Sequence, residues 1–137
     1  MPILNVKISQ SPTLPPAVIG AVAATLSRLT HAILGKDPAV TAVAIDLVPA
    51  SQWFVGGPSL ADAQQASFWL DIVVTESTNT KDEKAAYVRG VFAAMAELLG
   101  PIHAESYVLV REVKADAYGY GGRTQESRYV ETKMKAA

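Results

Sequence analysis

The sequence predicts an α+β fold in which one strand–helix–strand unit occurs twice. Both halves of the 137-residue chain contain, in order, an alternating strand pattern, a helical pattern, a second strand pattern and an aromatic–Gly-Gly element. The separation from Pro2 to Gly56 is 54 residues, and that from Phe68 to Gly121 is 53. Such self-similarity at a nearly fixed spacing indicates an internal duplication.

We expect residues 1–137 to form a single domain, because this length is typical of one hydrophobic core. The two repeats span about 2–60 and 67–125, and a short C-terminal tail follows. A helix joins the two strands of each unit, so those strands should be parallel with a right-handed crossover. Two such units side by side give a four-stranded sheet with both helices on one face.

In the first repeat, "ILNVKIS" (residues 3–9) alternates in hydrophobicity as a strand does. Prolines then precede a stretch with one apolar stripe at helical spacing, which comprises Val18, Val22, Leu26, Leu29 and Ile33. Gly35 is a typical residue at a helix C-terminus. The segment "AVTAVAIDLVP" (residues 39–49) is the second strand, and "ASQWFVGGPS" is a loop or short hairpin.

The second repeat begins with "SFWLDIVVTES" (residues 67–77), which again alternates. Thr80 followed by Glu83 predicts a capping box, and the helix that it opens should end at Gly100. The strand "SYVLVREV" and the element "ADAYGYGGR" complete the repeat. We expect the tail segment "SRYVETK" to add a short edge strand to a neighbouring subunit.

The sheet face opposite the helices should also carry apolar side chains. We place six residues there: Ile3, Ala42, Ala44, Val73, Val108 and Val110. No further segment of the chain is left to cover this face, so a symmetric oligomer that packs these faces together is expected.

Composition argues against several functional classes. The formal net charge of −1 gives no electrostatic basis for binding nucleic acid or an anionic membrane. With no cysteine and two distant histidines, a metal site is not expected. The longest apolar stretch, residues 17–35, contains Arg28 and His31, which argues against a membrane span. We expect a cytoplasmic protein without a signal peptide.

Pro2 directly follows the initiator methionine. A small residue at this position usually permits methionine removal, which would leave Pro2 with a free secondary amine. An α-amine has a pKa of about 7.7–8.0, and an apolar pocket disfavours its charged form. The neutral amine of a rigid ring could then accept a proton near neutral pH and return it to carbon.

The order and spacing of these motifs resemble the tautomerase superfamily over nearly the whole chain, from Pro2 to Gly122. The resemblance rests on the proline behind Met1, a strand of the form P-I-x-x-V-x-I, and the aromatic–x-V-G-G turn. It implies a cofactor-free keto–enol isomerase that uses Pro2 as general acid and base on a small carboxylic acid. It also implies a homotrimer, with Trp53 and Tyr118 at the positions of aromatic residues near the proline.

The resemblance is weakest where family members hold carboxylates with arginine. Here Pro12, Ala42 and Ala44 occupy the matching positions, and "TESTNTK" lacks the arginines of the decarboxylase and dehalogenase members. Arg111 and Arg123 remain as candidates for binding the carboxylate. A cross-subunit salt bridge for Arg111 and a solvated surface position for Arg123 are equally open.

The resemblance places His31 near the sequence position of a functional histidine in the cis-3-chloroacrylic acid dehalogenase branch, which makes it a candidate for substrate binding. Helical geometry, however, places its side chain opposite the apolar stripe, toward solvent.

Two other functions stay open. The first is hydration or decarboxylation of an unsaturated or 3-oxo acid, which needs a water-activating carboxylate; Asp46, Asp116 and Glu112 are candidates. The second is an oligomer that binds a small ligand without chemistry, in which Pro2 would have no catalytic role.

Overall fold

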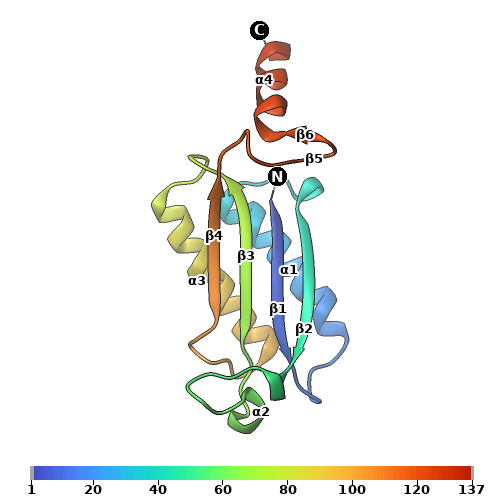
Figure 1. Cartoon of the computed structure of the whole chain (residues 1–137), viewed down its shortest axis with the longest axis vertical. Helices are drawn as coiled ribbons and strands as arrows, with labels where there is room; N and C mark the ends of the chain where they lie inside the picture. The colour runs from blue at the N-terminus through green and yellow to red at the C-terminus, as the bar shows by residue number, and fades with distance from the viewer. Residues whose placement is uncertain (1, 137) are drawn as a thin grey trace.

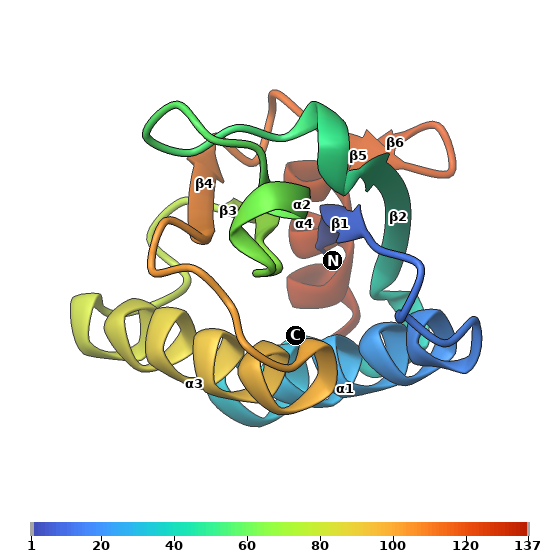
Figure 2. The same cartoon turned by 90° about the horizontal axis from the view of Figure 1, so that it is seen from below.

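The computed structural model describes residues 2–136. It contains one four-stranded mixed sheet with the two long helices packed on the same face (Figures 1 and 2). The strands are β1 (Ile3–Gln10), β2 (Ala42–Pro49), β3 (Phe68–Thr75), β4 (Tyr107–Val113), β5 (Gly119–Tyr120) and β6 (Arg123–Thr124). The helices are α1 (Ala17–Leu34), α2 (Leu60–Ala63), α3 (Lys81–Leu99) and α4 (Gln125–Ala136), with 3-10 turns η1 (Pro38–Val40) and η2 (Ala50–Gln52).

The sheet has the strand order β2-β1-β3-β4, which confirms the duplicated βαβ architecture. β1 and β2 are parallel, as are β3 and β4, and the two repeats meet where β1 pairs antiparallel with β3. A local two-fold relationship between the repeats follows from this pairing. The N-terminal end of β1 therefore lies beside the C-terminal end of β3.

The hydrophobic core lies between the sheet and the helices. Alternate residues of β1 and β3 are fully buried there, as the alternation predicts: Leu4, Val6, Ile8, Phe68, Leu70, Ile72 and Val74. Val22 and Leu26 of α1 pack against them. Among the described residues, a buried polar contact joins the two long helices, since Thr30 Oγ1 lies 2.8 Å from the Tyr87 hydroxyl. Burial raises the pKa of Tyr87 to about 12.

The opposite sheet face is uncovered, as expected, but the predicted placement of two residues on it is wrong. Val108 and Val110 pair in register with Leu70 and Ile72 and pack against the core instead. The reason is the period-two alternation, in which a one-residue error in phase exchanges the faces. The uncovered face of β4 carries Tyr107, Leu109 and Arg111, beside Trp69, Asp71 and Val73 of β3.

The helix termini follow the sequence signals. Thr80 and Glu83 form a complete capping box at the start of α3, and Gly35 ends α1 in the left-handed conformation at φ 69°. By length and composition α1 meets the criteria for a membrane-crossing helix. Its apolar stripe packs on the sheet, however, which accounts for that composition within the fold.

The expectation of an edge strand in the tail is wrong, because residues 125–136 form helix α4. A side-chain pair at helical spacing stabilises it, since Glu131 and Lys135 form an ion pair at 3.1 Å. α4 extends beyond the end of the sheet on which the N-terminus lies (Figure 1). Tyr129 is 62% exposed there.

Candidate active site

Pro2 lies buried at one end of the sheet and lines a cavity of about 410 Å³. Its carbonyl oxygen accepts a hydrogen bond from the Ala42 N–H at 3.1 Å, which fixes the start of the chain against β2. Residues 39–42 form one wall, and Tyr118, Tyr120 and Gln125 form another. The lining is mainly apolar, so an amine at Pro2 would lie in a poorly solvated environment. Met1, whose removal we expect, lies outside the described residues.

The two tyrosines reach Pro2 because a tight hairpin follows β4. β5 and β6 pair antiparallel around Gly121 and Gly122, both of which have positive φ. The Tyr118 hydroxyl lies 3.0 Å from Thr75 Oγ1, which links the hairpin to the end of β3. Figure 1 shows the hairpin and α4 at the same end of the sheet as the N-terminus. The second repeat therefore supplies the aromatic wall of the Pro2 cavity.

A second, more polar cavity adjoins the first and shares Tyr120 and Gln125 with it. Lys36 and Arg128 are its cationic residues, and the threonines that line it are Thr75, Thr78 and Thr132. The Arg128 guanidinium lies 3.8 Å from the centroid of the Tyr120 ring and donates to the Tyr120 carbonyl at 3.0 Å. This stacking holds a permanent positive charge beside the Pro2 cavity.

Two buried donors at this cavity have no hydrogen-bond acceptor within the described chain. They are Gln125 Nε2 and Arg128 Nε. An unpaired buried donor is costly, so each is a candidate partner for an acceptor that the isolated chain does not provide. The Gln125 amide and the stacked Arg128 guanidinium thus favour a ligand with carboxylate-like acceptors, although Glu126 also lines this cavity.

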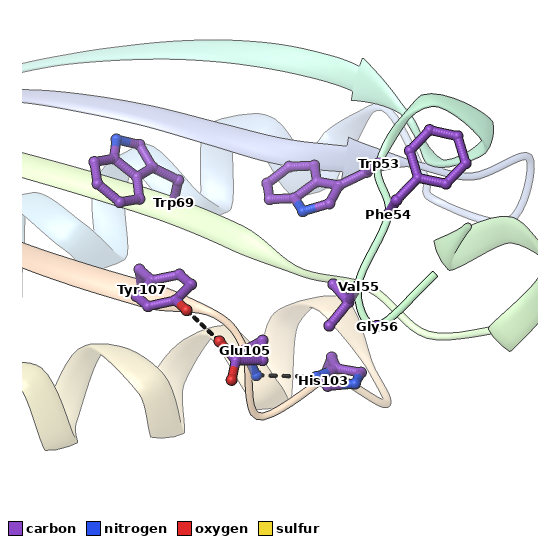
Figure 3. A pocket seen from close by; sticks show the side chains of 8 residues that line it. All are labelled: Trp53, Phe54, Val55, Gly56, Trp69, His103, Glu105 and Tyr107. Atoms are coloured by element: carbon purple, nitrogen blue, oxygen red, sulfur yellow. Dashed lines mark hydrogen bonds between the residues drawn. The ribbon is translucent and has the colours of Figure 1, made fainter. Parts of the chain in front are cut away.

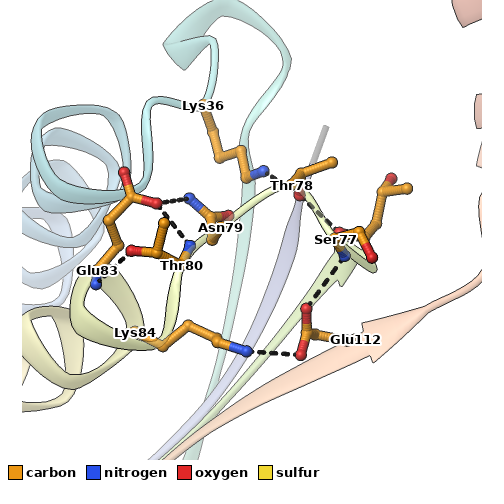
Figure 4. Close-up of polar contacts among 9 residues, drawn as sticks. Lys36, Ser77, Thr78, Asn79, Thr80, Glu83, Lys84 and Glu112 are labelled. Carbon is orange, nitrogen blue, oxygen red and sulfur yellow. Dashed lines mark hydrogen bonds and ion pairs between the residues drawn. The ribbon is translucent and has the colours of Figure 1, made fainter.

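Lys36 is held in place by the loop that follows β3. Its Nζ donates to Thr78 Oγ1 at 2.9 Å, and the surrounding network joins Asn79, Thr80 and Glu83 (Figure 4). Burial lowers the pKa of Lys36, while the Glu83 and Glu112 carboxylates oppose that shift. Two of its three ammonium donors remain available for other acceptors.

Both arginines predicted to bind a carboxylate are already paired within the chain. Arg111 makes a bidentate contact with Asp71 on the uncovered sheet face, at 3.2 Å from Nε and 2.8 Å from the second nitrogen. Arg123 pairs with Glu131 of α4. The salt bridge of Arg111 therefore lies within the chain and not across subunits, because the alternation places Asp71 diagonally opposite it on β3. Neither arginine lines the Pro2 cavity.

Within one chain, Trp53 and His31 also do not line the Pro2 cavity. Trp53 follows η2 at the opposite end of the sheet, where it lines a third cavity with Trp69 and Tyr107 (Figure 3). His31 is exposed, as its helical position predicts, and its Nδ1 lies 3.0 Å from the Lys36 carbonyl. Of the predicted site residues, the structure therefore brings together Pro2 and Tyr118.

The carboxylates considered for activating water do not line the Pro2 cavity within the described residues. Glu112 forms an ion pair with Lys84 at 2.7 Å, and this contact lowers the pKa of Glu112. Asp46 lies on the uncovered sheet face in register with Lys7, and Asp116 lies by the β5–β6 turn. None of these three carboxylates is therefore placed beside Pro2 by the described residues of one chain.

Sequence reasoning missed Gln125, Arg128 and Lys36. Gln125 and Arg128 share a helix face at a spacing of three residues, but that signal is visible only if the tail is identified as a helix. The charged residues at helical spacing in "QESRYVETKMK" carried this signal. Lys36 lies just beyond the helix that Gly35 ends, and nothing local distinguishes it from a surface lysine.

No protein-family model matches the chain, and no curated protein matches its sequence. Solved structures do match its fold. A fused 4-OT, a wild-type symmetric trimer, has a TM-score of 0.79 at 21% identity, with 92% of this chain and 98% of that one covered. A crystal structure of a protein inactivated by 2-oxo-3-pentynoate has a TM-score of 0.80 at 13% identity, with the same two coverages.

A member of the cis-3-chloroacrylic acid dehalogenase family is also similar, with a TM-score of 0.72 at 17% identity, covering 93% of this chain and 91% of that one. These likenesses extend over nearly the full length of each protein. The chain therefore has the tautomerase-superfamily fold, as its sequence motifs predict.

Proposed function

We propose that this protein is a cofactor-independent tautomerase that ketonises a small enol acid with Pro2 as its general acid and base. The observation that carries the proposal is the burial of Pro2 in a mainly apolar cavity closed by Tyr118 and Tyr120. One structural neighbour is described as inactivated by 2-oxo-3-pentynoate, an electrophilic 2-oxo acid, which supports the same substrate class.

The proposed reaction moves one proton. After removal of Met1, the neutral amine of Pro2 accepts the proton of the substrate's enol hydroxyl. The electron pair of that O–H bond forms the carbonyl, and the π electrons of the enol double bond move onto its far carbon, or through the conjugated system to the terminal carbon in a dienol, where they form the new C–H bond. The ammonium of Pro2 then returns the proton to that carbon, so the enzyme ends the cycle unchanged. The low polarity of the cavity favours the neutral amine at the start.

The carboxylate of the substrate would lie toward Gln125 and Arg128. Both offer buried donors without an acceptor in the described chain, and the cation of Arg128 is fixed over Tyr120. Arginine matches a carboxylate with two parallel N–H donors. These residues take over the role that the sequence assigned to Arg111 and Arg123.

The test is the ketonisation rate of phenylenolpyruvate and of 2-hydroxymuconate, on protein shown by mass spectrometry to lack Met1. We expect saturable ketonisation of at least one of them. Arg128→Gln should raise KM about ten- to a hundredfold with a smaller change in kcat, because a charge-assisted contact contributes roughly 1.5–3 kcal/mol. Arg28→Gln, at an exposed position of α1, is the matched control. Equal KM values in both variants would remove Arg128 from the binding site.

We also propose that the chain assembles as a trimer through the uncovered sheet face. That face carries half-buried Val73 and exposed Ala44 and Leu109 with no covering element in the described chain. A fused 4-OT relative in fold is described as a symmetric trimer. Light scattering should give a mass near three chains of 14.5 kDa. A monomeric mass at micromolar concentration would contradict this assembly.

A further inference from the structure

The two repeats each form a cavity at the equivalent position. In the first repeat Ile3 pairs with Ala42, and both line the Pro2 cavity. In the second repeat Trp69 pairs with Tyr107 at the corresponding register, and both line the cavity at the opposite end of the sheet. The aromatic–Gly-Gly element of the other repeat closes each cavity, with Tyr118 in one case and Trp53 in the other.

The Trp53 cavity lacks the reactive amine of the Pro2 cavity. The residue before Trp69 is Phe68, which is fully buried within the chain in the core. Proton transfer by an amino-terminal proline is therefore impossible at this end. The cavity is nevertheless larger, at about 670 Å³, a volume within the usual range of small-molecule sites.

The lining of the Trp53 cavity is aromatic and electron-rich. Its aromatic residues are Trp53, Phe54, Trp69 and Tyr107, and Figure 3 shows the two tryptophans on one side of the cavity and His103 and Glu105 on the other. Trp69 and Tyr107 have ring centroids 6.0 Å apart at an interplanar angle of 52°, so their faces are inclined toward each other. The faces of such rings carry negative electrostatic potential.

The polar groups of the cavity add negative charge. Glu105 accepts a hydrogen bond from the Tyr107 hydroxyl, which orients the carboxylate beside the rings. His103 Nδ1 accepts the Glu105 backbone N–H at 3.0 Å, so this nitrogen is already engaged within the chain. No lysine or arginine of residues 2–136 lines this cavity.

We propose that this cavity binds a small organic cation of the alkylated-ammonium class. Aromatic faces combined with a carboxylate attract such a cation, because the ring quadrupoles and the carboxylate act in the same direction. An anion of the kind that suits Arg128 would meet unfavourable charge here. The duplication would thus have produced two sites of opposite charge preference at the two ends of one sheet. This inference does not depend on the chemistry proposed for Pro2.

The probe is choline chloride, titrated into the assembled protein and followed by the indole N–H signals in ¹H–¹⁵N spectra. The chain contains 2 tryptophans, and both line this cavity, so every indole signal reports on it. We expect both signals to shift saturably, with a dissociation constant on the order of millimolar. Sodium chloride at equal ionic strength should not reproduce the shift. Trp53→Leu assigns the signals and should weaken binding about threefold.

Two controls separate charge recognition from simple apolar binding. The alcohol 3,3-dimethyl-1-butanol has the shape of choline without its charge and should bind at least several-fold more weakly. Glu105→Gln keeps an acceptor for Tyr107 but removes the charge, and should weaken choline binding about fivefold without affecting the alcohol.

Equal affinity for choline and the alcohol would overturn the proposal, as would unchanged choline binding in Glu105→Gln. The proposal would also be overturned if the indole signals did not respond to choline chloride up to the concentration at which sodium chloride alone perturbs the spectrum. That last result would indicate that a second copy of the chain covers the cavity.

Discussion

Replacing Pro2 by alanine should lower kcat for enol ketonisation by roughly 10²–10⁴, the range that a positioned general acid–base group contributes. Alanine also permits removal of Met1, so the variant keeps an α-amine, but a flexible primary amine is less well aimed than the ring nitrogen. Alanine should keep the buried position of residue 2, because the hydrogen bond from the Ala42 N–H at 3.1 Å goes to a backbone carbonyl. The loss should therefore appear in the rate and not in the thermal unfolding midpoint.

A second variant distinguishes the amine from the ring. Inserting a glutamate between Met1 and Pro2 blocks methionine removal and leaves the proline nitrogen in a peptide bond, where it has no basic lone pair. We expect this protein to fold and to be inactive. If both variants retained full activity, Pro2 would have no catalytic role, and a ligand-binding oligomer would be the better description. If the wild type itself were inactive on enol acids, hydration and decarboxylation assays would follow.

The fold could be predicted from sequence because its signals are local and repeated. Alternation in residues 68–74, the capping box at Thr80 and the left-handed Gly35 each act within a few residues, and the structure reproduces all three. The duplication then fixed the topology, since two parallel units have few ways to share a sheet.

The site was harder to predict because its residues come together only through tertiary structure. Pro2 and Tyr118 were identified from motif order, which the fold preserves. Predicting the partner of Arg111 requires the phase of β4 relative to β3. A one-residue error in that phase places Arg111 and Asp71 on opposite faces of the sheet, so their ion pair was missed. The position of Arg128 depended on the conformation of the tail, whose helical signal lies in the spacing of its charged residues and not in an apolar stripe.

Replacing Gly119 by alanine should abolish most activity while leaving the main sheet intact. A Cβ at this position would lie 1.9 Å from the Arg123 carbonyl oxygen and 2.7 Å from the Cα of Thr124. The contacts are with backbone atoms of the paired strand, so β5 and β6 cannot remain hydrogen-bonded. Tyr118, Tyr120 and Gln125 would then leave the wall of the Pro2 cavity, and a displacement of about 1 Å can cost on the order of 10²-fold in rate.

The hairpin lies outside the hydrophobic core, so the thermal unfolding midpoint of Gly119→Ala should change little compared with the loss of rate. Gly20→Ala is the matched control, because a Cβ there meets no atom within 4 Å and the residue lies inside α1. That change should stabilise the protein by up to about 1 kcal/mol and leave kcat/KM unaltered. Full activity in Gly119→Ala would mean that the hairpin is not part of the working site. The aromatic wall around Pro2 would then have to come from another subunit, and Trp53, at the far end of the sheet in its own chain, would be the residue to test next.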